Sequence, residues 1–316
     1  MMFHRALLAA AMSAALLGAA QAQDVIRIGG TANYGPVLPV KAAEKLGLFE
    51  KAGVKMQFTN FAGGAQSMEG LAAGEADLIN YFPPGLALAK ARGVKATIVG
   101  ASTTTPRGWA IMVAKDSPIT DIKQLVGKKV GVTTNGATTD FFALWAAKQA
   151  GGAITRVPLG GGGLVPGLLA GNVEAISTYP PLTYRLALGG QARILVDLGS
   201  AMSANLPDVW IASDEVINKK PEALRRALVA LYSAIKYMQD NPDWTLKLLE
   251  EQAQLAPDIA KEEFKQTIMG LSSTGTLKEA DVAASLELGS LAGNVKMPDP
   301  KSLFTDKFVP VQTISP

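Results

Sequence analysis

Residues 70–84 read GLAAGEADLINYFPP and residues 167–181 read GLLAGNVEAISTYPP, so one motif occurs twice in the chain. The copies begin 97 positions apart, and seven of their fifteen aligned positions are identical. A glycine-rich segment precedes each copy, at residues 63–64 and at residues 160–163. Each copy predicts a glycine loop, a short helix that ends at glycine, a buried strand and an aromatic-Pro-Pro turn. Two copies of one α/β unit predict two similar lobes with a ligand site between them.

The first 22 residues have the pattern of a secretory signal peptide. Arg5 supplies a positive charge, residues 6–20 are a run of small apolar residues, and Ala20-Gln21-Ala22 fits an A-x-A cleavage site. The apolar run is too short to span a bilayer comfortably. We therefore expect a secreted mature chain that begins near Gln23.

The composition argues against catalysis and nucleic-acid binding. The only histidine is His4, inside the predicted signal peptide, and the chain has no cysteine. A Ser-His-Asp triad, a cysteine nucleophile, a disulfide and an ordinary zinc site are thereby excluded, although carboxylates, lysine and serine remain. The mature chain carries 29 basic and 27 acidic residues, too even a balance for a nucleic-acid partner. We expect no enzyme activity and no cofactor.

Strand and helix patterns alternate through the first two thirds of the mature chain. Strand-like runs occur at residues 25–28, 54–61 and 130–133, and helical segments follow them. This alternation predicts an α/β fold in which helices flank mixed, mostly parallel sheets.

The last third predicts helices only. Residues 221–239 place Leu224, Leu228, Leu231 and Ile235 on one helix face, and residues 242–252, 257–269 and 277–288 continue as further helices. Proline opens three of these four segments, where its missing N–H costs no hydrogen bond. We expect a helical C-terminal extension that covers one lobe.

Four stretches resemble a known family. They are KLGLFEKAGV from Lys45, LAAGEAD from Leu71, DIKQLVGKKVGV from Asp121 and LAGNVEA from Leu169. In this order they are similar to the periplasmic solute-binding proteins of ABC importers, in the group that binds nitrate, sulfonates and taurine. That group also includes binders of pyrimidine precursors and aromatic carboxylates. The resemblance covers nearly the whole mature chain.

The resemblance implies a type 2 periplasmic binding fold and a transport role. Lobe 1 would comprise residues 23–106 and 206–316, lobe 2 would comprise residues 107–205, and the two chain crossings would form the hinge. The protein would be a periplasmic monomer that binds a small organic anion and delivers it to a membrane permease with its ATPase.

The site is expected beyond the carboxyl ends of the strands, where loops lead into helix N-termini. Loops at these positions are rich in glycine, asparagine, threonine and aromatic residues, and glycine allows the backbone to approach a ligand closely. The candidate ligand-binding residues are Asn33, Tyr34, Gly64, Gln66, Phe82, Arg107, Asn135, Thr138, Thr139 and Tyr179.

Phe82 and Tyr179 occupy the same position in the two motif copies, so we expect them to approach one ligand from opposite sides. Tyr81 would then point into the core, because neighbours on a strand face opposite ways. Tyr34 could instead pack between the lobes, and Thr138 or Thr139 could serve only as a helix cap. For Trp109 and Trp210, near the crossings, cleft and core positions are both open.

Arg107 is the main candidate to hold an acidic ligand, because a guanidinium can bind an oxyanion with two hydrogen bonds. It lies beside a predicted crossing and could equally be a solvated hinge residue. Arg156 and Arg185 are weaker candidates. If none of the three reaches the cleft, the site is neutral, and a neutral pyrimidine-type ligand is favoured over a small hard anion.

Two other function classes remain open from the sequence. A periplasmic enzyme could use Asp and Glu pairs, but Asp77 and Glu174 begin strands at the end away from the cleft. A sensor that presents its ligand to a membrane kinase would have the same sequence pattern as an importer subunit.

Overall fold

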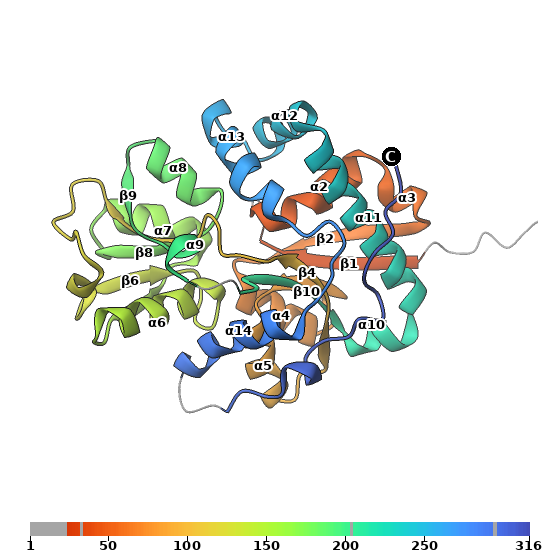
Figure 1. The fold of residues 1–316 in the computed structure, drawn as a ribbon, viewed down its shortest axis with the longest axis horizontal. Coiled ribbons are helices and arrows are strands. Elements are labelled where there is room, and N and C mark those ends of the chain that lie inside the picture. The colour runs from red at the N-terminus through yellow and green to blue at the C-terminus, as the bar shows by residue number, and fades with distance from the viewer. Residues whose placement is uncertain (1–23, 32–33, 203–204, 293–295) are drawn as a thin grey trace, which may run out of the picture.

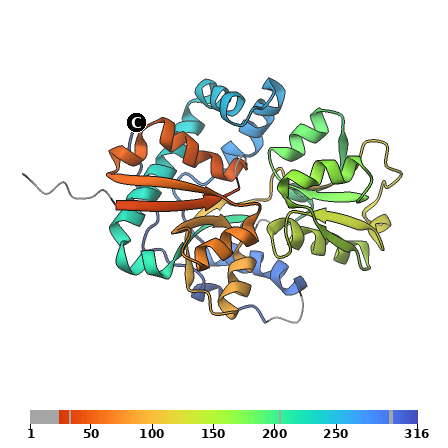
Figure 2. The same cartoon turned by 180° about the vertical axis from the view of Figure 1, so that it is seen from behind.

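The computed structural model describes residues 24–31, 34–202, 205–292 and 296–316. The predicted signal peptide and Asn33 lie outside these residues. The chain forms two lobes side by side, each built on one five-stranded sheet (Figures 1 and 2). The predicted α/β architecture with two helix-flanked sheets is confirmed.

Lobe 1 contains the sheet β2-β1-β3-β10-β4, whose strands are β1 (Asp24–Gly30), β2 (Val54–Asn60), β3 (Leu78–Tyr81), β4 (Ala96–Thr103) and β10 (Asp208–Ser213). Strand β1 pairs in parallel with β2 and β3, in a register that sets Ile28 opposite Leu78. Strand β10 runs antiparallel between β3 and β4, so it returns from the second lobe into the middle of the first sheet.

Lobe 2 contains the sheet β7-β6-β8-β5-β9, whose strands are β5 (Ala110–Ala114), β6 (Lys129–Val132), β7 (Thr155–Pro158), β8 (Ala175–Thr178) and β9 (Ala192–Asp197). Strand β6 pairs in parallel with β7 and β8, and β5 runs antiparallel between β8 and β9. The strand order repeats that of lobe 1, with β5 in the place of β10.

The helices flank both sheets. They are α2 (Leu38–Lys45), α3 (Leu48–Lys51), α4 (Gly64–Ala72), α5 (Pro83–Ala91), α6 (Thr138–Ala150), α7 (Gly160–Leu169), α8 (Leu182–Leu188), α9 (Leu198–Ala201), α10 (Asp214–Lys219), α11 (Pro221–Asp240), α12 (Pro242–Gln252), α13 (Pro257–Gln266) and α14 (Glu279–Gly289). In the described ranges, no helix combines the length and apolar character that crossing a bilayer requires.

The C-terminal extension is helical, as predicted, and it touches both lobes. Helix α11 packs on α2 and β1 of lobe 1, and its leucine face is buried. Helix α13 packs against α8 of lobe 2, whereas α14 packs against α5 of lobe 1 and α6 of lobe 2 (Figure 1). The extension therefore bridges the lobes rather than covering one of them.

The repeated motif forms the same packing unit in each lobe. In lobe 1 the Phe61 ring lies between β1 and α4, where Gly29 and Gly70 both face it. A Cβ atom on Gly70 would lie 2.4 Å from Cζ of Phe61, and one on Gly29 would lie 2.7 Å from Cε2. The helix can therefore approach the sheet this closely only because both positions are glycine.

Lobe 2 repeats this arrangement with Leu159 in place of the aromatic ring. Gly131 of β6 and Gly167 of α7 face its Cδ1 atom, at 2.9 and 2.7 Å from where their Cβ atoms would lie. The repeat seen in the sequence is thus a repeat of helix-on-sheet packing.

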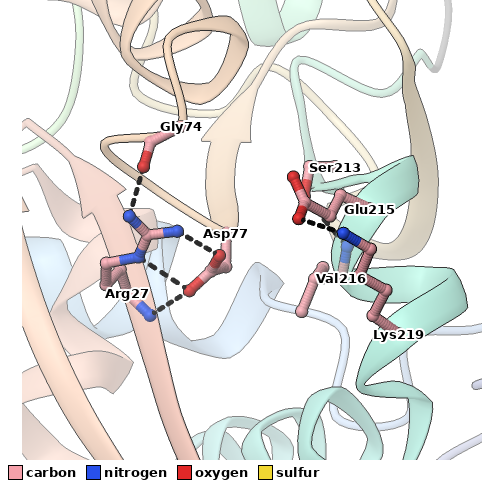
Figure 3. Close-up of polar contacts among 7 residues, drawn as sticks. All are labelled: Arg27, Gly74, Asp77, Ser213, Glu215, Val216 and Lys219. Atoms are coloured by element: carbon pink, nitrogen blue, oxygen red, sulfur yellow. Dashed lines mark hydrogen bonds and ion pairs between the residues drawn. The ribbon is translucent and has the colours of Figure 1, made fainter.

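The matched acids of the two copies also have the same role. The Asp77 carboxylate accepts a hydrogen bond from the backbone N–H of Arg27 at 2.9 Å, and Glu174 accepts one from that of Lys129 at 2.9 Å. Asp77 forms an ion pair with the Arg27 guanidinium as well, which also bonds to the carbonyl of Gly74 (Figure 3). Both acids thus tie neighbouring strands together at the end away from the cleft, as expected.

One local prediction was wrong and one strand was missed. Residues 160–163 were expected to form a loop, but they are the first turn of α7, a helix whose next turns bury Leu164 and Leu168. Strand β10 was not predicted from the sequence. Its pairing partners β3 and β4 lie more than 100 positions earlier in the chain, so no local pattern reports them.

We predict that Gly70→Ala lowers the free energy of unfolding by about 1–3 kcal/mol, because the added methyl group would overlap the Phe61 ring. This loss outweighs the roughly 1 kcal/mol by which alanine favours a helix over glycine. Gly162→Ala is the matched control, since Gly162 is also helical but no atom lies within 4 Å of its Cβ position. Urea unfolding of both variants decides the matter: equal stability would contradict the packing argument.

Candidate ligand-binding site

A cavity of about 40 Å³ lies between the lobes. Residues from both lobes line it, and most come from strand ends and from the first turns of helices. They are Thr31, Tyr34, Gly63, Gly64, Asn80, Tyr81, Trp109, Thr133, Ala137, Thr138, Thr139, Tyr179 and Asp208. The lobes meet closely around it, since the backbone N–H of Gly35 donates to the carbonyl of Pro180 at 3.3 Å.

Two helix N-termini face the cavity, one from each lobe. Gly64 begins α4, and Thr138 and Thr139 begin α6. The first N–H groups of a helix have no partner within the helix, and the helix dipole makes this end favourable for negative charge. Neither threonine is the helix cap, because that position is Ala137. The two helix starts can therefore hold an oxyanion with backbone donors.

Three aromatic rings form one wall. Tyr34 packs edge-on against Tyr179 and Trp109, with ring centroids 5.5 and 5.8 Å apart. Trp109 packs in turn on Phe142, at 5.1 Å. Tyr34 and Tyr179 belong to different lobes, so this wall exists only when the lobes are together. It offers flat apolar surface to a ligand.

The only carboxylate among the described lining residues is Asp208, at the start of β10. It is almost completely buried and accepts a hydrogen bond from the Tyr34 hydroxyl. Burial raises the pKa of Asp208 to about 8, although the hydrogen bond from Tyr34 acts in the opposite direction. At neutral pH this carboxyl group is therefore largely protonated in the ligand-free cavity. A ligand with a positive charge or a strong N–H donor would favour its ionised form.

Asn80 also lines the cavity, from β3 beside β10, where its register partner is Trp210, and it is 5% exposed. Neither its amide nitrogen nor its amide oxygen has a hydrogen-bond partner in the described part of the protein. A buried amide left unpaired in this way costs free energy. Since Asn80 lines the cavity, a ligand can supply both partners.

No lysine or arginine is found among the described residues that line the cavity. Arg156 bonds to the buried Asp140 carboxylate, at 2.6 Å to each oxygen. Arg107 lies in a separate groove beside Tyr184, and Arg185 lines another groove, beyond Tyr179. The negative end of a ligand would therefore be held by backbone N–H groups and hydroxyls rather than by a cation.

The structure brings five of the predicted site residues together at the cavity, namely Tyr34, Gly64, Thr138, Thr139 and Tyr179. Asn33 lies outside the described residues. The other four candidates, Gln66, Phe82, Arg107 and Asn135, lie away from it.

The structure shows why these four residues do not line the cavity. Phe82 follows the last residue of β3 and caps α5, and its ring is fully buried against Phe141 and Phe142 of the other lobe. The expectation that Phe82 and Tyr179 flank one ligand is thereby corrected, as is the expectation that Tyr81 points away. Gln66 is exposed and accepts a hydrogen bond from the backbone of Ala62.

Arg107 and Asn135 are also exposed. Arg107 lies in the groove that Tyr184 also lines, and Asn135 lies in the turn before α6, in the groove that Tyr81 also lines. In this turn the backbone carbonyl of Gly136 makes the contact with Tyr81, and the side chain of Asn135 is exposed.

Sequence reasoning missed Asp208, Asn80 and Tyr81. Asp208 lies on the unpredicted strand β10, so nothing local placed it at the cleft. Asn80 and Tyr81 end the buried strand of the first motif copy, and polar residues in an apolar run were the available signal. The described residues contain no group of three or more acidic, histidine or cysteine side chains that could hold a metal.

Comparison with known proteins identifies the family of this chain. The family model described as NMT1/THI5 like matches residues 36–245, more than half of the chain. The taurine-binding periplasmic protein of Escherichia coli (strain K12) is 25% identical over 224 residues, 69% of this chain and 68% of that protein.

Two solved structures share the fold. The alkanesulfonate-binding protein of Xanthomonas axonopodis pv. citri, bound to MOPS, has a TM-score of 0.76 at 21% identity and covers 93% of this chain and 98% of its own. The periplasmic aliphatic sulphonate binding protein of Escherichia coli has a TM-score of 0.73 at 22% identity, over 90% and 98%.

Two repeated lobes with a cavity at their helix N-termini define the periplasmic binding protein fold. The chain belongs to the NMT1/THI5-like family, and its relatives include proteins named as a taurine-binding periplasmic protein and as putative aliphatic sulfonates-binding proteins.

The raised pKa of Asp208 predicts a pH dependence of stability. The folded protein keeps the Asp208 proton up to about pH 8, whereas the unfolded chain releases it near pH 4. The free energy of unfolding should therefore fall as the pH rises from 5 to 8, and Asp208→Asn should flatten this fall. Burial also raises the pKa of Glu263 to about 8, so Glu263→Gln should flatten it further.

Urea unfolding at pH 5, 6.5 and 8 measures the effect. Asp116→Asn, which changes an exposed turn residue, serves as the matched control and should follow the wild-type profile. A profile for Asp208→Asn that runs parallel to the wild-type one would show that Asp208 is already ionised in the folded state.

Proposed function

We propose that this protein is the periplasmic substrate-binding component of an ABC importer. It captures a small organic anion between its lobes and delivers it, unchanged, to a membrane permease that works with an ATPase. The observation that carries this proposal is the cavity between two lobes that share one packing unit, with a helix N-terminus from each lobe, α4 and α6, facing it. The family relationship supports the same role.

The division into lobes and the hinge belong to the same proposal. Residues 23–106 and 206–316 would move as lobe 1, residues 107–205 would move as lobe 2, and the two crossings would bend between them. Closure of such lobes around a ligand is a known type of domain motion. The protein would act as a monomer.

The ligand we propose has two different ends. Its oxyanion, a sulfonate or a carboxylate, would accept hydrogen bonds from the N-termini of α4 and α6. Its other end would carry an N–H or O–H donor that faces Asp208 and Asn80, since a protonated or unpaired polar group there needs a partner. Taurine has both ends, and a relative of this chain is named as a taurine-binding protein.

A neutral pyrimidine-type ligand is the second candidate. It is favoured by the absence of lysine and arginine from the described cavity lining and by the aromatic wall of Tyr34, Trp109 and Tyr179. A ring with adjacent N–H and C=O groups would pair with the amide of Asn80.

We predict that taurine stabilises the protein against heat more than 1-propanesulfonate does. The two molecules have similar size and the same sulfonate, but only taurine carries an ammonium group for Asp208. At 100 times its dissociation constant a ligand adds about 2.7 kcal/mol of apparent stability. A thermal-shift screen should include both sulfonates, benzoate, uracil and nitrate. A response to uracil alone would replace the anion proposal with the pyrimidine one.

Calorimetric titration of Asp208→Asn tests the second end of the ligand. We expect this variant to bind taurine about 1.5–3 kcal/mol more weakly, the range for a hydrogen bond to a charged group, and to bind 1-propanesulfonate almost as the wild type does. Asp116→Asn should bind both ligands normally. Equal weakening for both sulfonates would show that Asp208 shapes the cavity without contacting the ammonium group.

A further inference from the structure

Tyr81 separates the ligand cavity from a second, larger space. Beyond its ring lies a groove with a volume of about 350 Å³, and Tyr81 is the one described residue that lines both the cavity and this groove. The cavity lies on the side of Gly64, and the groove lies on the side of Gly85.

The ring is held in this position by two glycines. A Cβ atom on Gly64 would lie 2.4 Å from Cδ2 of Tyr81, and one on Gly85 would lie 2.3 Å from Cε1 and Cζ on the other edge. Gly64 begins α4 and Gly85 lies in α5, so the ring fills a slot between the two helices. Any side chain at either glycine would have to displace it.

The hydroxyl group of Tyr81 joins its ring to lobe 2. It donates a hydrogen bond to the carbonyl oxygen of Gly136, in the turn that precedes α6 of lobe 2. Tyr81 itself is 3% exposed, and burial raises the pKa of its hydroxyl group well above the usual range. The hydroxyl therefore remains protonated and keeps its role as a donor.

The groove beyond the ring suits an apolar chain. Met68, Leu88, Ala89 and Val94 supply its less exposed apolar lining, whereas Glu69, Arg92 and Asn135 are exposed. The cavity itself has room only for a small ligand at about 40 Å³. Tyr81 is thus the one described residue shared by the small cavity and the larger groove.

We infer that Tyr81 determines the size of the ligand: its ring ends the cavity and restricts the protein to short-chain solutes. This inference rests on the proposed function, because it assigns the chain length of the same ligand. A sulfonate held at the start of α4 lies next to the ring, so a chain bound to that sulfonate could enter the groove once the ring is removed.

The test is titration calorimetry with linear 1-alkanesulfonates from methane- to octanesulfonate. In the wild type, affinity should stop rising after the first few carbons. In Tyr81→Ala it should keep rising by roughly fourfold per added methylene group, the factor that corresponds to burying one CH₂. The optimum should therefore move to longer chains, and octanesulfonate should gain at least tenfold over the wild type.

Tyr81→Phe is the matched control. It keeps the ring and loses only the hydrogen bond to Gly136, so it should retain the wild-type limit on chain length even if all affinities fall. An unchanged chain-length profile in Tyr81→Ala, with a melting temperature that shows it folded, would overturn the inference and leave the proposed function intact.

Failure of every alkanesulfonate to bind the wild type would refute the proposed ligand class. A second probe then tests the role of Tyr81 independently of that class. The fluorescent dye 1-anilinonaphthalene-8-sulfonate is too large for the closed cavity. We expect folded Tyr81→Ala to bind it with enhanced emission at concentrations where the wild type and Tyr81→Phe do not. Equal emission from all three proteins would refute the role of Tyr81 as a wall.

Discussion

The close approach of one helix to one sheet, repeated in each lobe, is the constraint on which the rest of the structure depends. Gly29 and Gly70 let α4 settle on β1 around Phe61, and Gly131 with Gly167 does the same for α7 and β6 around Leu159. Interiors are packed at crystal-like density, so an added methyl group at these contacts cannot be absorbed without movement. The position of α4, and through it the direction of its N-terminus toward the cleft, follows from this contact.

The polar character of the cavity follows from how its donors are supplied. Backbone N–H groups at the starts of α4 and α6 need no charged side chain to attract an oxyanion, and they add no bulk to a small cavity. None of the three nearby arginines lines the cavity, and Arg156 is bound to Asp140 in the first turn of α6. Asp208 is the only carboxyl group among the described lining residues, and its protonation makes the ligand-free site close to neutral. A site of this kind distinguishes ligands by where they donate and accept hydrogen bonds more than by net charge.

The sequence predicted most of what is local and repeated. Alternating strand and helix patterns, the helical C-terminal third and the loops at Gly64, Thr138 and Tyr179 all follow from spacing within about twenty residues. It failed where the decisive contact is distant. Asp208 reaches the cavity because β10 inserts between β3 and β4, and the sequence around residue 208 carries no sign of that partner. The sequence assigned Phe82 to the cavity and Tyr81 to the core, but in the structure Tyr81 lines the cavity. Phe82 packs instead on Phe141 and Phe142 of the other lobe, which are distant in sequence.

Cavity residues lie at both places where the chain crosses between the lobes. Strand β5 begins lobe 2 directly after Trp109, and β10 returns to lobe 1 with Asp208 as its first residue, so each antiparallel strand carries a cavity residue where a crossing ends. Tyr34 links the two, because its ring packs on Trp109 while its hydroxyl group bonds to Asp208. In the proposed function, a ligand that draws the proton from Asp208 would change the hydrogen bond to Tyr34 beside both crossings. Its binding energy would then act where the relative position of the lobes is set, and no separate element would be needed to couple ligand capture to the proposed closure.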